Sequence, residues 1–492
     1  MFLKDKYLAS GAFEKFKARL VAGGDQQDRT MYEDLSAPTA ATANVFAMAA
    51  LAARERRTVA TVDIGGAYLN ASMVVESGVI VHMRLNKVMT EILVKIDPKF
   101  AEFVTEDGSS VVQLDKALYG CVEAAHLWYL MLREKLEAYG FEANPAEPCV
   151  FNKHNAAGVQ ISLTLHVDDL LTTCTSEAEI DIFFAYLRTQ FPVITVHKGK
   201  TLSYLGMLFD FREEGAVYVT MQGTVDDTLE GCGVNRNCAT PATDNLFVIR
   251  DAPKVSEEEA IWCRSYVAKV LYIAKRVKPE CLTAVSFLTS RVGAYDTDDL
   301  GKVRRLLGYI RKTRTAGVCF RIGSDLVIRV YVDAAYGVHI HDGKSHSGAY
   351  TVLGVGGPLE AKSGKQKNVT KSSTEAELVA LSDHAGRGIN LRIFLAGQGY
   401  GIVPVIIYQD NMSCMAIMAR GGPTSERSRH INIRYFWLCE RIKLGEVMLV
   451  HRATSLMYAN VLTKPLQGKQ FITERDGITN WPEHRASAVE ST

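Results

Sequence analysis

Alternation of apolar and polar residues predicts a β-hairpin around two adjacent carboxylates. The apolar positions of one parity are Val159, Ile161, Leu163, Leu165 and Val167. This period of two is typical of a half-buried strand. A second apolar run, residues 170–173, follows directly after Asp168 and Asp169. The pattern therefore predicts a tight hairpin over residues 159–173 with both carboxylates at its tip.

Two neighbouring carboxylates need a compensating charge, because like charges side by side repel. Mg²⁺ prefers carboxylate oxygens and typically takes one or two of them from a protein. A metal-binding hairpin is one interpretation of Asp168 and Asp169. An ordinary acidic turn explains the same stretch equally well when it is taken alone, because Asp favours turns.

A third carboxylate lies at the end of another predicted strand. Residues 57–64 read as a β segment, and Asp63 stands near its end, followed by Gly65 and Gly66. One Asp at a strand end and two at a hairpin tip could bind two metal ions. Such ions, ~3.5–4 Å apart, hold the attacking and leaving oxygens of a phosphoryl transfer.

The remaining pattern predicts a long chain of mixed elements. Helices are expected at residues 45–53, 123–139, 177–190, 257–275, 279–292 and 300–314. Strands are expected at residues 111–118, 202–211, 215–221 and 328–333, with a turn at 213–215 between the middle two. Residues after Gly468 lack periodicity, so we expect a frayed tail.

Composition places the chain among globular intracellular proteins. It has 492 residues, of which 47% are hydrophobic and 23% charged, enough for several domains. The net charge is +1, so overall charge does not indicate a nucleic-acid-binding protein. Local basic clusters at residues 15–19, 304–314 and 427–434 could bind nucleic acid, but each is also explained as a solvated face. The ten cysteines form no Cys-x-x-Cys pair, which indicates reduced thiols. No signal peptide or run of eighteen apolar residues predicts a membrane span.

Short motifs in a fixed order carry a family resemblance over roughly residues 13 to 470. They lie at residues 17–22, 63–70, 118–129, 148–151, 167–169, 204–207, 271–274, 372–377, 429–434 and 462–466. In these motifs the chain resembles the reverse transcriptase–ribonuclease H part of copia-type (Pseudoviridae-like) retrotransposon polyproteins. No single motif is decisive, but their shared order is highly specific.

The resemblance implies an α+β and α/β multidomain fold. A right-hand polymerase with fingers, palm, thumb and connection would precede a ribonuclease H-like domain. We expect fingers and palm at residues 1–210, thumb and connection at 211–325, the nuclease at 326–467, and a disordered tail at 468–492. The chain begins with the fingers under way and shows no gag, protease or integrase signature. We therefore expect a polyprotein fragment, a processed piece or a decayed genomic copy.

By resemblance, Asp63, Asp168 and Asp169 are the catalytic palm triad and bind Mg²⁺ or Mn²⁺. Lys17 and Arg19 stand where the family's fingers present cations to the incoming triphosphate.

Three further positions are expected to contact substrate. Tyr68 matches the aromatic that excludes a nucleotide 2′-hydroxyl, although a ring packed in the core is an alternative. Gly206 belongs to the hairpin that holds the primer end. Glu123 stands where a Gln often contacts the nucleotide, and would add an anion close to the triphosphate.

The C-terminal part supplies a second expected catalytic and metal-binding triad, Asp333, Glu377 and Asp410. Glu375 or Glu377 could be the helix ligand. We favour Glu377 from the family register, since Glu375 suits the dipole of a helix start.

Some positions depart from the family pattern. Asn460 replaces a frequent fourth acid of the nuclease and could weaken its metal affinity. His166 replaces a Tyr, Ala125-His126 replaces Pro-Arg, and a Lys near Gly65-Gly66 is missing. His430 is as compatible with a structural role as with a functional one.

The implied function is RNA-directed DNA polymerisation with cleavage of the RNA in hybrids. Expected partners are an RNA template, a DNA or tRNA-type primer, dNTPs and an RNA–DNA hybrid, without a membrane, in a cytoplasmic particle or the nucleus. Oligomeric state stays open. The departures at Glu123, His166 and Asn460 motivate an alternative, a weakened or inactive nucleic-acid-binding remnant. A third interpretation is an active nuclease beside an inert polymerase.

Overall fold

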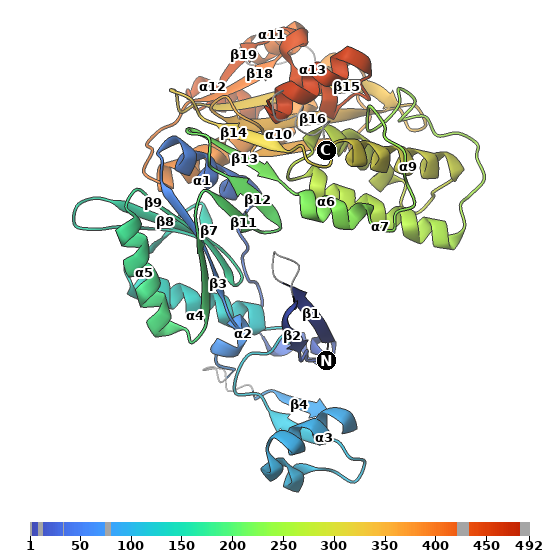
Figure 1. Ribbon diagram of the computed structural model, residues 1–492. Helices are drawn as coiled ribbons and strands as arrows, with labels where there is room; N and C mark the ends of the chain where they lie inside the picture. The colour runs from blue at the N-terminus through green and yellow to red at the C-terminus, as the bar shows by residue number, and fades with distance from the viewer. Residues whose placement is uncertain (1, 8–12, 33, 74–79, 421–431, 483–492) are drawn as a thin grey trace.

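The computed structural model describes residues 2–7, 13–32, 34–73, 80–420 and 432–482. Figure 1 shows the N-terminal elements at one end of the molecule and the C-terminal α/β region at the other, with a helical block beside them. In the described part of the chain no helix combines the length and apolarity needed to cross a bilayer. All ten cysteines are buried and free.

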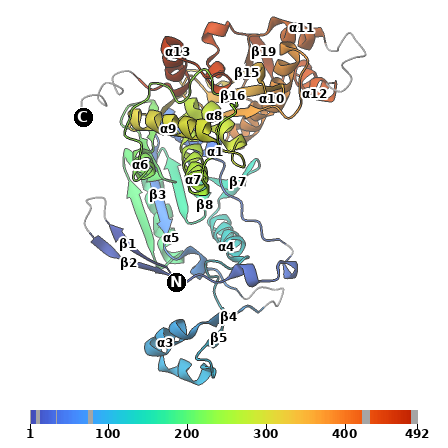
Figure 2. The same ribbon diagram turned by 90° about the vertical axis from the view of Figure 1, so that its right-hand side faces the viewer.

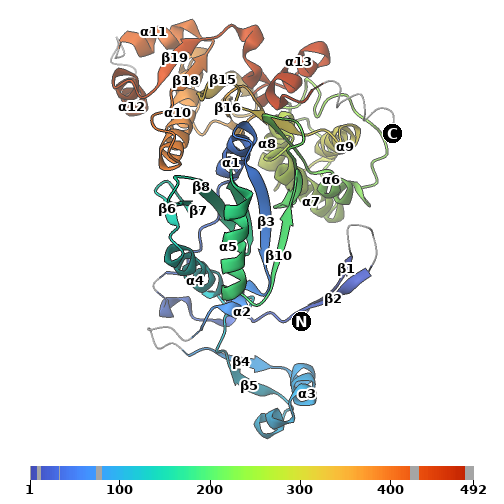
Figure 3. The same ribbon diagram turned by 60° about the vertical axis from the view of Figure 1, so that its left-hand side comes forward.

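A six-stranded antiparallel sheet forms the centre of the N-terminal half. Its strand order is β10-β3-β9-β8-β7-β6. The strands are β3 (Thr58–Ile64), β6 (Glu142–Asn144), β7 (Glu147–His154), β8 (Gln160–His166), β9 (Asp169–Cys174) and β10 (Ile194–Lys198). Helices α4 (Ala124–Ala138) and α5 (Glu177–Gln190) accompany this sheet (Figure 3). The Tyr186 hydroxyl of α5 donates to the Lys135 carbonyl of α4 at 2.8 Å, which holds the two helices together.

Smaller elements project from the end of this sheet. Strands β1 (Phe2–Tyr7) and β2 (Phe13–Arg19) form one hairpin, and β4 (His82–Leu85) pairs with β5 (Ser110–Gln113) beside α3 (Lys87–Ile96). Figure 2 shows both units at the end away from the C-terminal sheet. The short helix α2 (Ala67–Asn70) connects β3 to this region. The strand expected at residues 111–118 is therefore shorter than its pattern indicated.

A second sheet links the two halves of the chain. Its order is β11-β12-β13-β14, with β11 (Thr201–Tyr204), β12 (Met207–Asp210), β13 (Ala216–Thr220) and β14 (Val318–Arg321). The pattern predicted one strand at 202–211, but these residues form the hairpin that the resemblance predicts around Gly206, because Leu205 and Gly206 adopt positive φ angles of 51° and 73° and turn the chain. Helix α1 (Thr42–Arg54) packs against β13 and β14. The sheet crosses the expected limit at residue 210, and the proposed domain limits stay predictions.

A helical block follows β13. It contains α6 (Gln222–Leu229), α7 (Glu257–Ala274), α8 (Leu282–Ser290) and α9 (Thr297–Lys312). Helix α7 begins with a full capping box, in which Ser256 and Glu259 satisfy each other's backbone amides. Helix α7 packs on α8 and α9, and α8 packs on strand β17 of the C-terminal sheet.

The C-terminal sheet has the order β17-β16-β15-β18-β19. Strands β15 (Ile328–His339), β16 (Lys344–Leu353) and β17 (Glu360–Lys365) are antiparallel, and β18 (Val405–Gln409) and β19 (Met448–His451) add in parallel. Helix α10 (Ser373–Gly397) packs on β15 and β16, while α11 (Met412–Arg420) and α12 (Asn432–Lys443) pack on α10. Three antiparallel strands extended by two parallel ones give the ribonuclease H-like fold. The expected fold class, a polymerase followed by such a domain, is confirmed.

The expectation of a disordered tail from residue 468 is wrong for its first part. Residues Gly468–Thr479 form helix α13, and Phe471 and Ile478 are buried. The Phe471 ring packs edge-on against Tyr309 of α9, with 5.6 Å between ring centroids. This helix depends on a partner distant in sequence, so local periodicity did not predict it. Residues 483–492 lie outside the described part.

Candidate active sites

Strand pairing places the three palm carboxylates at one end of the first sheet. Asp63 of β3 lies directly opposite Asp169 of β9 in the antiparallel register. His166 and Asp169 are paired across the β8–β9 hairpin, so Val167 and Asp168 form its two-residue turn. Val167 has a positive φ of 58°, as tight hairpin turns require. Residues far apart in sequence are thus neighbours on adjacent strands.

Hydrogen bonds to backbone carbonyls fix this hairpin tip. The Trp128 indole nitrogen of α4 donates to the Val167 carbonyl at 2.6 Å, and the Ile64 amide donates to the Asp168 carbonyl at 3.0 Å. The buried Tyr204 hydroxyl donates to the Thr164 carbonyl at 3.2 Å. The turn is therefore positioned by a helix, by β3 and by the β11–β12 hairpin together.

The palm cluster keeps contact with solvent. Asp63 is exposed, whereas Asp168 and Asp169 are half-buried. Burial raises the pKa of Asp169 to about 6, and the charges of Asp168 and Asp63 add to this effect. Three neighbouring carboxylates are a donor set suited to a hard divalent cation, so these residues fit Mg²⁺ or Mn²⁺.

An aromatic pair connects the palm carboxylates to the fingers hairpin. The Tyr68 and Tyr119 rings pack with centroids 4.5 Å apart, and the Arg19 guanidinium lies over Tyr119 at 5.4 Å. Burial raises the pKa of both tyrosines, and the charge of Asp168 raises it further. The structure thus brings Arg19 and Tyr68 towards the carboxylates. Lys17 lies in β2, but its side chain is outside the described part.

Tyr119 is a contact that the sequence interpretation missed. It belongs to the motif at residues 118–129, yet no role was expected for it. Its membership in that motif was the available signal, and its place between Arg19 and Tyr68 shows why an aromatic residue suits this position.

Glu123 lies at the start of α4, where hydrogen bonds engage its carboxylate. Its side chain is buried, and its carboxylate accepts hydrogen bonds from the Gln27 amide at 3.0 and 3.3 Å and from the Tyr32 hydroxyl at 2.9 Å. The Gln27 carbonyl oxygen in turn accepts from the Val122 amide at 2.9 Å. The expectation of an anion close to the triphosphate stays a prediction. The carboxylate holds the segment of Gln27 and Tyr32 against the start of α4.

Gly206 lies at the exposed turn of the β11–β12 hairpin. The Tyr272 hydroxyl of α7 donates to the Leu205 carbonyl at 3.3 Å, so the helical block contacts this turn. Through Tyr204 the same hairpin also contacts the catalytic hairpin. This arrangement is compatible with the primer-holding role expected for Gly206, which stays a prediction.

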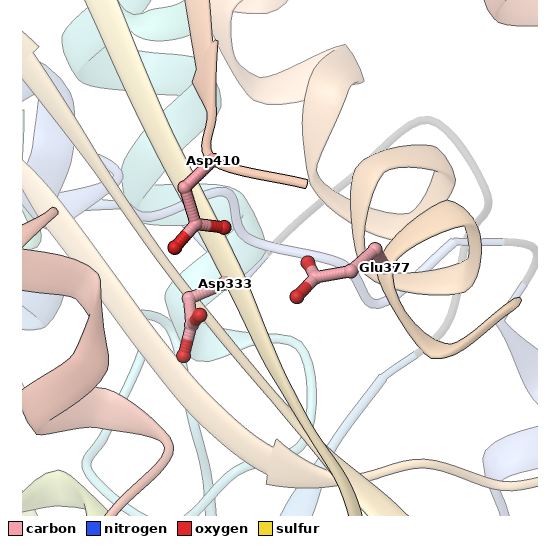
Figure 4. A group of neighbouring side chains, drawn as sticks. All are labelled: Asp333, Glu377 and Asp410. Atoms are coloured by element: carbon pink, nitrogen blue, oxygen red, sulfur yellow. The ribbon is translucent and has the colours of Figure 1, made fainter. Parts of the chain in front are cut away.

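The C-terminal domain contains a compact acidic triad. Figure 4 shows the Glu377 carboxylate directed towards those of Asp333 and Asp410. Asp333 lies on β15, Glu377 on α10, and Asp410 directly follows β18. One ligand oxygen from each lies within 4.8 Å of the others, the only such group among the described residues. The donor set fits a divalent cation.

The structure distinguishes Glu377 from Glu375. The Ser372 hydroxyl caps α10 by accepting from the Glu375 amide at 3.2 Å, and the Glu375 carboxylate accepts from the Lys371 amide at 2.8 Å. Glu375 thus stabilises the helix start. Glu377 accepts from the Gln409 amide at 3.2 Å and lies in the triad. Burial raises the pKa of Glu377 to about 9, and the charges of Asp333 and Asp410 contribute.

Asn460 lies beside this triad, and its side chain is already hydrogen-bonded to Lys464. Its side-chain oxygen accepts from the Lys464 ammonium at 2.5 Å, and the same ammonium lies 3.3 Å from Asp333 Oδ2. The Thr463 hydroxyl also donates to Asp333. The sequence interpretation gave Lys464 no role, although the motif at residues 462–466 contains it. His430 lies outside the described residues, as does most of the basic cluster 427–434.

Residues 3–242 match the family described as reverse transcriptase (RNA-dependent DNA polymerase). The Retrovirus-related Pol polyprotein from transposon TNT 1-94 of Nicotiana tabacum is 24% identical over 466 residues, covering 93% of this chain and 33% of that protein. The Retrovirus-related Pol polyprotein from transposon RE1 of Arabidopsis thaliana is 24% identical over 487 residues, covering 97% of this chain and 31% of that protein. The chain thus spans about a third of the length of these curated relatives.

Two solved structures are also similar. An LC11-RNase H1 in complex with RNA/DNA hybrid has 14% identity and a TM-score of 0.21, covering 28% of this chain and 93% of that one. A Prototype Foamy Virus Protease-Reverse Transcriptase has 12% identity and a TM-score of 0.24, covering 95% of this chain and 51% of that one. The fold assignment rests on strand order instead. Motif order and the matches agree: residues 3–242 match a reverse transcriptase domain, and nearly the whole chain is similar to part of copia-like retrotransposon polyproteins.

Proposed function

We propose that the chain acts as an RNA-directed DNA polymerase with a fused ribonuclease H. The observation that carries the proposal is the pairing of Asp63 with Asp169, with Asp168 in the adjoining turn. This register gathers three carboxylates at an accessible end of the sheet in a reverse transcriptase domain. The separate triad Asp333, Glu377 and Asp410 supplies the nuclease.

In the palm, Asp63, Asp168 and Asp169 would hold Mg²⁺ or Mn²⁺. When bound, two such ions activate the primer 3′-hydroxyl and stabilise the leaving oxygen of an in-line displacement. Arg19 would contact the triphosphate, since its guanidinium lies over Tyr119, a ring close enough to Asp168 and Asp63 for their charges to raise its pKa. The ring of Tyr68, packed against Tyr119, would exclude a nucleotide 2′-hydroxyl.

In the nuclease, Asp333, Glu377 and Asp410 would hold the same kind of cation for hydrolysis of the RNA strand. Gln409 orients Glu377, and the Thr454 hydroxyl orients Asp410 at 2.9 Å. The substrates that these sites fit are a template RNA with a DNA or tRNA-type primer, dNTPs and an RNA–DNA hybrid.

Primer extension by the purified chain tests the polymerase. We expect dNTP incorporation on an RNA template with Mg²⁺ or Mn²⁺, and its loss in Asp168→Asn while Asp325→Asn, an exposed loop position, keeps it. Absence of incorporation across a range of metals and salt concentrations would refute the polymerase activity. Cleavage of a labelled hybrid, lost in Asp333→Asn, tests the nuclease separately.

The remnant hypothesis stays distinguishable by the same assays. A remnant would bind nucleic acid with a steep salt dependence, because phosphate contacts dominate affinity, but it would not turn over. Glu123, one of the three departures that motivated this hypothesis, is buried and hydrogen-bonded to Gln27. The contact between Asn460 and Lys464 bears on the nuclease alone.

A further inference from the structure

The positively charged Lys464 side chain lies beside the nuclease triad and contacts Asp333. Its ammonium lies 3.3 Å from Asp333 Oδ2 and 3.4 Å from Asp333 Oδ1, so it faces both oxygens of one carboxylate. The same nitrogen donates to the Asn460 side-chain oxygen at 2.5 Å. It therefore contacts the two oxygen-bearing side chains on one side of the triad.

The surroundings of Asn460 fix this contact. Its side-chain nitrogen donates to the Met457 carbonyl at 2.6 Å and to the Thr454 carbonyl at 3.3 Å. With its nitrogen engaged by two carbonyls, the amide must direct its oxygen towards Lys464. Asn460 is buried, whereas Lys464 keeps 39% of its side-chain surface exposed. A flexible, partly solvated ammonium thus meets a fixed oxygen.

We propose that the Lys464 ammonium serves as a built-in cation of the nuclease site and competes there with divalent metal. It contacts the Asp333 carboxylate and the Asn460 oxygen. The Glu377 and Asp410 carboxylates remain for a divalent cation. The first divalent cation would bind among the three acids, and a second would have to displace Lys464. This inference rests on the proposed nuclease function and adds a residue that sets its metal stoichiometry and affinity.

The charge of Lys464 sets how strongly it should change the affinity for a divalent metal. A positive charge close to the ligand oxygens repels an incoming cation, and the interaction is weakened where the ammonium contacts water. Removing it should therefore tighten divalent-metal binding about tenfold rather than by many orders of magnitude. Lys464→Arg keeps the charge and should behave as the unchanged chain does.

Metal binding can be counted directly with Mn²⁺. The full chain carrying Asp63→Asn, Asp168→Asn and Asp169→Asn removes the palm ligands, so that calorimetry and electron paramagnetic resonance report the nuclease site. In this background we expect one Mn²⁺ per chain. Adding Lys464→Met should tighten that ion about tenfold and allow a second to bind. Lys469→Met, an exposed position on α13, is the matched control and should change neither quantity.

The outcomes separate this inference from the proposed function. If Glu377→Gln leaves Mn²⁺ binding intact in that background, the triad is not the metal site and the nuclease proposal fails. If Glu377→Gln abolishes binding but Lys464→Met matches Lys469→Met, only the role of Lys464 is refuted. Weaker Mn²⁺ binding in Lys464→Met would also refute it, because a purely structural lysine gives that result.

A folding defect would not leave the proposal untested. Lys464 also lowers the pKa of the buried Glu474 carboxyl, which burial raises to about 7, so its loss could disturb the packing of α13. Lys464→Gln keeps a donor for Asn460 and removes only the charge, and it should reproduce the tighter binding. Thermal unfolding with and without Mn²⁺ checks that each variant is folded and gives a second measure of affinity.

Discussion

The palm and nuclease clusters have the same chemistry but differ in their contact with water. Asp63 is exposed and its two partners are half-buried, whereas Asp333 and Glu377 are 2% and 5% exposed. Only the nuclease acids, among the residues described, bring their ligand oxygens within 4.8 Å of one another. Under the proposed function, the open cluster would accept a long template and primer, and the compact cluster would cleave at a single strand position.

Burial explains what surrounds each cluster. A buried carboxylate without partners is costly, so the nuclease acids have hydrogen-bond donors from Thr463, Gln409 and Thr454 and a positive charge from Lys464. The palm carboxylates need less compensation, because solvent reaches them. The protein thus builds part of the countercharge into the nuclease site.

The largest expected effect is the separation of the two activities. Glu377→Gln should lower hybrid cleavage by about 10³-fold or more, since a lost metal ligand costs several kcal/mol of transition-state stabilisation. Primer extension should stay within about twofold, because the palm ligands lie on another sheet. Glu375→Gln, on the same helix, is the control. Equal loss of both activities in gel assays would contradict two independent sites.

The buried nuclease cluster should make metal-free stability pH-dependent. The pKa of Glu377 rises from 4.5 to about 9, so between these values the native state binds a proton that the unfolded chain has lost. The free energy of unfolding should therefore fall as pH rises through this range. In EDTA, Glu377→Gln should lack this component, which is of the order of a few kcal/mol. Urea unfolding at pH 6 and pH 9 measures it, and equal slopes in the variant and the parent would contradict the burial.

The open palm cluster should show the same dependence more weakly and at lower pH. The pKa of Asp169 rises from 3.8 to about 6, so its contribution to stability is lost as pH rises between these values. In EDTA, Asp169→Asn should remove this smaller dependence of the free energy of unfolding on pH, whereas Asp325→Asn should not. A slope as large as that of Glu377 would show that the palm site is as desolvated as the nuclease site.

The smallest expected effect concerns Glu123. Because its carboxylate is engaged by Gln27 and Tyr32, Glu123→Gln should change the KM for dNTPs by less than about twofold while costing about 1–3 kcal/mol of stability. Steady-state primer extension and urea unfolding measure the two quantities. A large fall in KM would instead place the anion of Glu123 near the triphosphate.

Local pattern predicted many elements and the tip of the catalytic hairpin. Helix α5 has the bounds expected from its apolar positions, and β8 and β9 flank Asp168 and Asp169 as the alternation indicated. These features depend on neighbours within a few residues, so periodicity and turn chemistry are sufficient. The hairpin within residues 202–211 was expected only from the family resemblance around Gly206, because its turn contains Leu205, a residue that rarely adopts a positive φ.

Sequence by itself determined which side chains carry the chemistry: the acids, their order along the chain, and the motifs that indicate a polymerase followed by a nuclease. Tertiary structure alone decided how they meet. Strand register placed Asp63 opposite Asp169, and the direction of side chains around α10 placed Glu377 in the triad. Packing between residues distant in sequence buried Glu123, ordered α13 and brought Lys464 to Asp333. These contacts join residues distant in sequence, and their energies depend on burial and charge, which a local pattern does not contain.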